Sequence, residues 1–339
     1  MRGWAALLGV AILGAPLSTR ADTPPSAWDR TRDPAAGERY RLHVLAEELM
    51  HAPGPPIRRF HEQNLERARS LLESASAATS PDVRLRFDLG EVYQDLGRNE
   101  EAIDVLNPAL AMAPRDARSA DAWLALAFAA AHLDRSQEEL AGYDAFLALS
   151  VSAHPSETVV SNRAEALMRL ERLDEAIAGY RNVIESMEHG GRPGTDYTVL
   201  VLARWGLAVA LDRNHDAAAS EHEASTAAAE DPDERIIGNQ DDVFFVPKYE
   251  RDWYYALGRT DHAKRETSPR LALKRWELVV RTWADYVQRA APNERWVPLA
   301  RAHLASAEVQ KAAVSARVKA MGPEKPAPDR GSSLPFEVH

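Results

Sequence analysis

Residues 83–114 read VRLRFDLGEVYQDLGRNEEAIDVLNPALAMAP, and this stretch decides the fold. Small residues occur where two helices would cross, at Gly90, Ala102 and Ala109, and large apolar residues lie between them. Gly97 falls in the middle, and Pro114 ends the pattern. Because glycine and proline interrupt helices in this way, the stretch predicts two helices joined by a tight turn.

The same pattern returns along the chain at a fixed offset of 37 residues. The matching series are Leu96, Leu133 and Leu170; Leu106, Tyr143 and Tyr180; Leu110, Leu147 and Ile184; and Gly90, Ala127 and Ala164. Each unit carries one apolar stripe per helix and cannot bury it alone, so units must stack on their neighbours. We therefore predict an all-α solenoid with units at about 83–114, 116–150, 158–187 and 195–232.

These units resemble the tetratricopeptide repeat (TPR) family, with the resemblance clearest over 83–232. The sequence departs from the family pattern at Glu139 and Phe146, where alanine is usual, and at Arg163, where leucine is usual. The resemblance implies a right-handed α-solenoid that binds a protein or peptide in its concave groove. The groove face lacks the lysine, arginine and asparagine set that clamps chaperone peptides, so that function is not carried over.

The first 21 residues have the order of a secretory signal peptide: a basic start, an apolar run over 4–17, and small residues at Thr19 and Ala21. The run is too short to span a bilayer comfortably, which takes about 20 residues. A buried first helix or an uncleaved anchor is the alternative. We expect cleavage after Ala21 and a periplasmic or secreted chain, which without cysteine has no lipid attachment site.

Two further segments flank the repeats. Residues 22–80 predict a leader, flexible over 22–33, and then a helix pair near 34–49 and 58–75. Residues 233–320 predict aromatic-rich capping helices after a small hairpin or structured loop at Ile236–Pro247, with long helices at 269–290 and 293–319. The aromatic residues there form either a cap on the stack or a docking patch. Residues 321–339 predict a disordered tail.

Composition and motifs argue against several classes of function. The formal net charge is −10, and removing Arg2 and Arg20 with the first 21 residues makes it −12, which disfavours nucleic acid and anionic membranes. No catalytic motif or cofactor motif is present, so we expect neither an enzyme nor a bound cofactor. Three weak candidates are better explained as loop or surface residues: the pair His215 and His222, the glycine-rich run at 190–194, and Asp241-Asp242.

The groove of the first units is the predicted binding site. We expect contacts from Phe87, Leu124 and Phe128, with a polarity set by Arg84, Glu91 and Asp121. The two phenylalanines could instead pack between helices. The leading hypothesis is a non-catalytic extracytoplasmic scaffold; the alternatives are a self-assembling envelope subunit and an enzyme with a site in 233–315.

Overall fold

The computed structural model describes residues 24–51, 58–150, 156–190, 197–238 and 249–322. Contacts divide the chain into two compact units, Met1–Pro247 and Lys248–His339, and each is described by itself. Over the described ranges every regular element is a helix, which confirms the all-α prediction. No helix in these ranges has the length and apolarity needed to cross a membrane.

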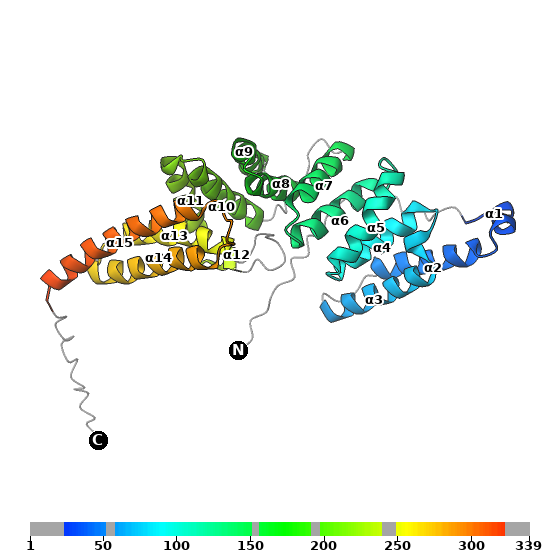
Figure 1. The fold of residues 1–339 in the computed structure, drawn as a ribbon, viewed down its shortest axis with the longest axis horizontal. Coiled ribbons are helices and arrows are strands. Elements are labelled where there is room, and N and C mark those ends of the chain that lie inside the picture. The colour runs from blue at the N-terminus through cyan, green and yellow to red at the C-terminus, as the bar shows by residue number, and fades with distance from the viewer. Residues whose placement is uncertain (1–23, 52–57, 151–155, 191–196, 239–248, 323–339) are drawn as a thin grey trace, which may run out of the picture. The chain divides into compact units, whose positions relative to one another are not determined.

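The first unit is a row of helical hairpins (Figure 1). Its helices are α1 (Ala27–Arg32), α2 (Ala36–Met50), α3 (Arg58–Ser74), α4 (Val83–Asp95), α5 (Asn99–Met112), α6 (Ser119–His132), α7 (Ser136–Leu149), α8 (Glu157–Arg169), α9 (Leu173–Gly190), α10 (Tyr197–Arg213), α11 (Ala217–Glu230) and α12 (Arg235–Gly238), with a 3-10 turn η1 (Ala77–Thr79). Each helix from α2 to α10 packs on the next one. The first helices of the pairs also contact one another: α2 with α4, α4 with α6, and α8 with α10. These contacts confirm the predicted stack.

The turn between the two helices of a pair is the same in three successive units. Gly97, Asp134 and Glu171 lie 37 residues apart, and their φ angles of 72°, 59° and 62° are left-handed. In each turn the amide of the next residue donates to a carbonyl five residues earlier, at 2.8 Å from Arg98 and 2.9 Å from Arg135 and Arg172. This hydrogen bond satisfies a carbonyl at the end of the first helix. The 37-residue period of the sequence is therefore also a repeat of the backbone conformation at these turns.

Close helix crossings explain the series of small residues. A Cβ atom on Gly90 would lie 2.4 Å from two side-chain carbons of Leu106, so glycine is needed for α4 to approach α5. In the next unit the small pair is Ala127 and Gly142, where an added Cβ would come within 2.8 Å of the alanine methyl group. Both positions are in register with the predicted contact between the helices of a pair.

One local prediction was wrong, and a second is tested only at its start. Residues 27–32 form α1, where a flexible leader was expected, because Ser26 and Asp29 cap each other's backbone amides. The first three residues of Ile236–Pro247, where a small hairpin or a structured loop was expected, lie in α12. There the carboxylate of Asp231 accepts hydrogen bonds from the amides of Arg235, Ile236 and Ile237 at 2.8–3.1 Å. Residues 239–247 of that predicted hairpin lie outside the described residues, as do 1–21 and nearly all of 321–339.

The second unit contains α13 (Glu250–Arg265), α14 (Pro269–Arg289) and α15 (Val297–Ala320). Its core is aromatic: the Trp253 ring meets Trp283 at 5.1 Å and Tyr286 at 5.0 Å, and His303 stacks on Trp283 at 4.6 Å. Trp276 is also buried. Since these rings fill the unit's own core, they do not form an exposed docking patch. The role of this unit as a cap stays a prediction.

Candidate functional site

A group of charged side chains gathers where α2, α4 and the start of α6 meet. We call it the Arg118 cluster; its members are His43, Glu47, Asp88, Glu91, Arg118 and Asp121. The sequence brings them together because α2 packs on α4, and α4 packs on α6, through the first helices of successive hairpins. Arg118 is the residue immediately before α6, so its side chain starts at the junction of two hairpins.

Arg118 is surrounded by more negative charge than it can balance. Its guanidinium lies 2.9 Å from Asp88 Oδ1, 3.3 Å from Glu91 Oε2, 3.4 Å from Glu47 Oε1 and 4.0 Å from Asp121 Oδ2. One guanidinium thus faces four carboxylates. If all four are ionised, three negative charges remain in a partly buried site, where Coulomb repulsion is stronger than in water.

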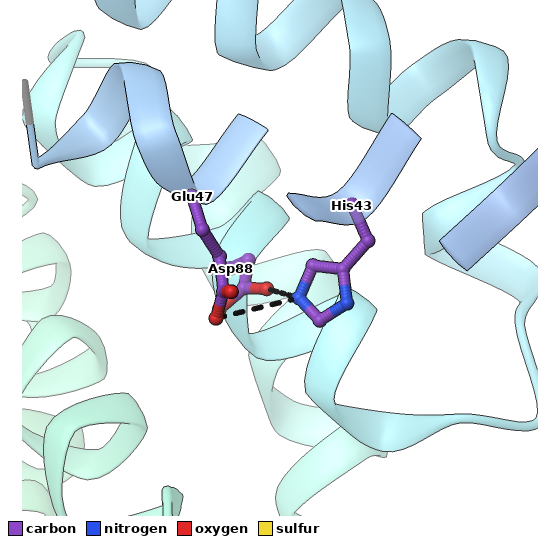
Figure 2. Close-up of side chains that lie close together, drawn as sticks. All are labelled: His43, Glu47 and Asp88. Carbon is purple, nitrogen blue, oxygen red and sulfur yellow. Dashed lines mark hydrogen bonds and ion pairs between the residues drawn. The ribbon is translucent and has the colours of Figure 1, made fainter. Parts of the chain in front are cut away.

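His43 forms the buried end of the cluster (Figure 2). Its Nε2 contacts Asp88 Oδ2 and lies 3.7 Å from Glu47 Oε1. The side chains of His43 and Asp88 are 2% and 0% exposed, whereas Glu47 is 30% exposed. The cluster therefore runs from a buried histidine–aspartate contact to carboxylates that reach solvent.

The pKa values in the cluster respond to this imbalance. Burial raises the pKa of Glu91 to about 8; Arg118 opposes the shift, and Asp88 and Asp121 add to it. Burial also raises the pKa of Asp121, against the effect of Arg118. Burial by itself would lower the pKa of Arg118, but the carboxylates of Glu91 and Asp88 outweigh it and raise that pKa. A proton on Glu91 is thus one way in which the cluster reduces its negative charge.

The polar half of the predicted binding site lies at this cluster. Glu91 and Asp121 are members of the cluster. Arg84 is on α4, four residues before Asp88, and its Nε lies 3.7 Å from Asp116 Oδ1. Arg84 and Asp121 are 41% and 42% exposed, so both reach solvent. Their role in binding a partner stays a prediction.

The apolar half of the predicted site is placed differently. Phe87 is fully buried in the main core of the first hairpins, and Leu124 is buried beside Tyr143 and Val159. Phe128 is half-buried, and its ring packs edge-on against Tyr143 at 6.1 Å. Phe87 and Leu124 therefore pack between helices and offer no surface to a partner.

The sequence reasoning missed His43, Glu47, Asp88 and Arg118. One signal was available: Asp88 falls between Leu85 and Val92 at helical spacing, so it interrupts the apolar stripe of α4. A charge in a buried stripe needs a partner. The partners could not be read from spacing, since His43 lies 45 residues before Asp88 and Arg118 lies 30 residues after it.

A second charged group lies between α7 and α8, and we call it the Arg169 cluster. Arg169 contacts Glu139 and lies 3.2 Å from Asp134 Oδ1; Glu165 is one helical turn away on α8. Glu139 and Glu165 are 1% and 2% exposed. Burial raises the pKa of Glu139 to about 8, and Arg169 opposes the shift. This cluster explains why Glu139 replaces the alanine that the resemblance predicts: Arg169 supplies its counter-charge.

The three weak candidates gain no support. His215 and His222 are exposed, and His215 is the left-handed residue of a turn, with φ 63°. Gly190 ends α9, and the rest of the glycine-rich run lies outside the described residues, as does Asp241-Asp242.

The first unit defines this chain as a helical-repeat protein built from stacked hairpins. Residues 59–126 match the family model described as tetratricopeptide repeat, and this stretch contains all of α4 and α5, nearly all of α3 and the first part of α6. No curated protein sequence matches the chain.

Several solved structures are similar in fold. MamA protein is 15% identical, with 62% of this chain and 98% of that chain covered and a TM-score of 0.44. A tetratricopeptide repeat protein from Parabacteroides merdae is 15% identical, with 80% and 98% covered and a TM-score of 0.44. The TPR domain of P58(IPK) is 13% identical, with 88% and 72% covered and a TM-score of 0.37. With TM-scores below 0.5, these similarities imply nothing about function.

Proposed function

We propose that this chain is a non-catalytic scaffold, working outside the cytoplasm, that binds a protein or peptide partner on the first helices of its hairpins. The observation that carries the proposal is the Arg118 cluster, where three successive hairpins contribute charged side chains to one site. Helical repeats present such surfaces to protein partners because neighbouring units contribute side chains in a regular array.

The charges of the cluster favour a partner segment that carries lysine or arginine. Four carboxyl groups surround one guanidinium, and three of them remain when Glu91 is protonated, as its raised pKa favours. Glu47, Glu91 and Asp121 are each partly exposed, at 30%, 17% and 42%. A cationic side chain placed among them would offset the excess negative charge. Complementary charge of this kind contributes to specificity and to the rate of association.

The location rests on the first 21 residues, whose basic, apolar and small segments have signal-peptide order. The proposed mature chain starts at Asp22 or within a few residues of it. N-terminal sequencing of the protein from a cell-envelope fraction tests this, and a cytosolic chain that begins at Met1 would contradict it.

Binding is tested by capture of partners from an envelope extract on the immobilised chain. The variant Glu91→Gln/Asp121→Asn should lose the captured partner while its helical circular dichroism is unchanged. The control Glu100→Gln/Asp104→Asn removes two exposed carboxylates from α5, a second helix, and should retain the partner. Equal capture by both variants would show that the Arg118 cluster is not the binding surface.

A further inference from the structure

We infer that His43, Glu47 and Asp88 form a binding site for one divalent first-row transition-metal ion, such as Zn²⁺ or Co²⁺. The observation is a convergence of ligand atoms: one ring nitrogen and two carboxylate oxygens from α2 and α4 lie within 4.8 Å of one another (Figure 2). This is the one group of three potential ligands of this kind found in the described part of the chain.

The geometry suits an ion at the centre of the three atoms. Zinc binds imidazole nitrogen and carboxylate oxygen at about 2.0–2.2 Å, so ligand atoms around it lie roughly 3–4 Å apart. His43 Nε2 is 3.7 Å from Glu47 Oε1 and in direct contact with Asp88 Oδ2. Glu47 is thus already at this spacing from His43, whereas the closer contact between His43 and Asp88 must lengthen for an ion to enter between them. The sequence spacing helps, because His43 and Glu47 are four residues apart and lie on one face of α2.

Two carboxylates approach the same nitrogen of His43. A neutral or protonated imidazole carries at most one proton on Nε2, so that atom can donate to only one of them. A metal ion can bind all three ligands at once. Because imidazole is among the ligands, the site favours zinc and its neighbours over Mg²⁺ and Ca²⁺, which prefer shells made of oxygen.

Arg118 contacts both carboxylates of the proposed site. It lies 3.4 Å from Glu47 Oε1, the oxygen that faces His43, so an ion would share that oxygen with the guanidinium. It also lies 2.9 Å from Asp88 Oδ1, whereas His43 contacts the other oxygen, Oδ2, so this second contact can stay when an ion binds. Outer hydrogen bonds of this kind orient the carboxylates that bind metals, which makes Arg118 a positioning residue. Arg118 also leaves an excess of negative charge among the four carboxylates around it, and a divalent cation would reduce that excess.

The test is a Co²⁺ titration of the full chain after treatment with a chelator, followed by absorption spectroscopy and calorimetry, with Zn²⁺ as the competing ion. We expect one Co²⁺ per chain, visible absorption bands from the bound ion, and displacement by Zn²⁺. Glu47→Gln should weaken Co²⁺ binding by at least about tenfold, because it removes a ligand from the partly exposed side of the site without exposing the core.

The matched control is Glu48→Gln, which removes the same charge from the next, exposed residue of α2 and should bind Co²⁺ as the parent does. Asp88→Asn is the second ligand variant, accepted only if its circular dichroism matches the parent. Absence of saturable Co²⁺ binding, or equal affinity of the parent and Glu47→Gln, would overturn the inference. This outcome is independent of partner capture, which is measured with a different variant.

Discussion

The Arg118 and Arg169 clusters both place one arginine among several carboxylates, but they differ in access to water. In the Arg169 cluster, Glu139 and Glu165 are 1% and 2% exposed, and Arg169 is 9% exposed. In the Arg118 cluster, Arg118 is 27% exposed and Glu47 is 30% exposed. The closed cluster therefore joins α7 and α8 through side chains that are almost out of contact with water, whereas the open cluster keeps several charged side chains within reach of solvent.

The largest effect should come from Arg169→Met measured above pH 8, where Glu139 is ionised and is left buried beside Glu165 without its main counter-charge. Breaking a buried pair in this way costs roughly 3–5 kcal/mol, measured as the free energy of unfolding in urea. Arg163→Met is the control on the same helix: Arg163 pairs with the half-exposed Asp144 at 2.5 Å, so its loss should cost about 0–1 kcal/mol. Equal losses would mean that the Arg169 cluster is no more closed than a surface ion pair.

A smaller loss should follow from Arg118→Met. Asp88 is fully buried, but His43 still contacts it, and water can reach Glu47. We expect a cost of about 1–3 kcal/mol in the same urea measurement, since one charged hydrogen-bond partner is removed from a site that stays partly solvated. The control is Arg115→Met in the exposed turn before α6. A loss as large as that of Arg169→Met would show that the open cluster is structural as well.

Glu139→Gln should change how stability depends on pH. Burial raises the pKa of Glu139 from 4.5 to about 8 in the folded chain, so the folded chain holds more protons than the unfolded chain between these values. The contribution of this group to the free energy of unfolding is therefore greatest at low pH. It falls as pH rises from about 4.5 to about 8, by at most about 1.4 kcal/mol per pH unit, and changes little above 8.

Urea unfolding of the parent and of Glu139→Gln, measured at several pH values from about 5 to about 8, tests this linkage. The parent should lose stability more steeply with rising pH, because glutamine does not ionise. Glu138→Gln, which changes the more exposed neighbouring residue, should follow the parent. Parallel profiles for the parent and Glu139→Gln would contradict the raised pKa.

The smallest effect is expected from Glu47→Gln in the presence of a chelator. Its side chain is 30% exposed, so we expect a change within about 0.5 kcal/mol in the free energy of unfolding. Added Zn²⁺ should then raise the melting temperature of the parent and leave that of Glu47→Gln nearly unchanged, because only a bound ion stabilises the folded state. A large loss of unfolding free energy in Glu47→Gln without metal would show that Glu47 itself stabilises the fold.

The repeats could be predicted from sequence because their physical causes are local. The crossing at Gly90 needs a small residue, and this need leaves a mark at the same position of the next units, at Ala127 and Ala164. The left-handed turn shows in the sequence at Gly97 only, because Asp134 and Glu171 hold the equivalent positions. The helix over 269–290 was also predictable, because Pro269 begins it and buried residues recur at helical spacing. The short helix α1 was missed because only the Ser26–Asp29 cap indicates it.

The candidate site was only half predictable. The helical spacing placed Arg84, Glu91 and Asp121 on the same side of successive units. It could not tell whether Phe87 faces the groove or packs in the core. The Arg118 cluster depends on contacts as distant as 71 residues, between Glu47 and Arg118. No local pattern specifies which distant charges will meet, so this part requires the folded chain.

The repeated turns have a consequence for the kinetics of folding. Each turn closes a hairpin over only a few residues, so the entropy lost on closing it is small. Each helix then contacts mainly the next helix or the one after it, which keeps the sequence separation of contacts low. The first unit should therefore fold rapidly, with hairpins forming locally and growth proceeding to either side. Docking of α7 on α8 should be a later step, because the side chains of Arg169 and Glu139 must both be dehydrated when the two helices pack together. Dehydrating two charged groups is costly, so this step should be slower than closing a hairpin.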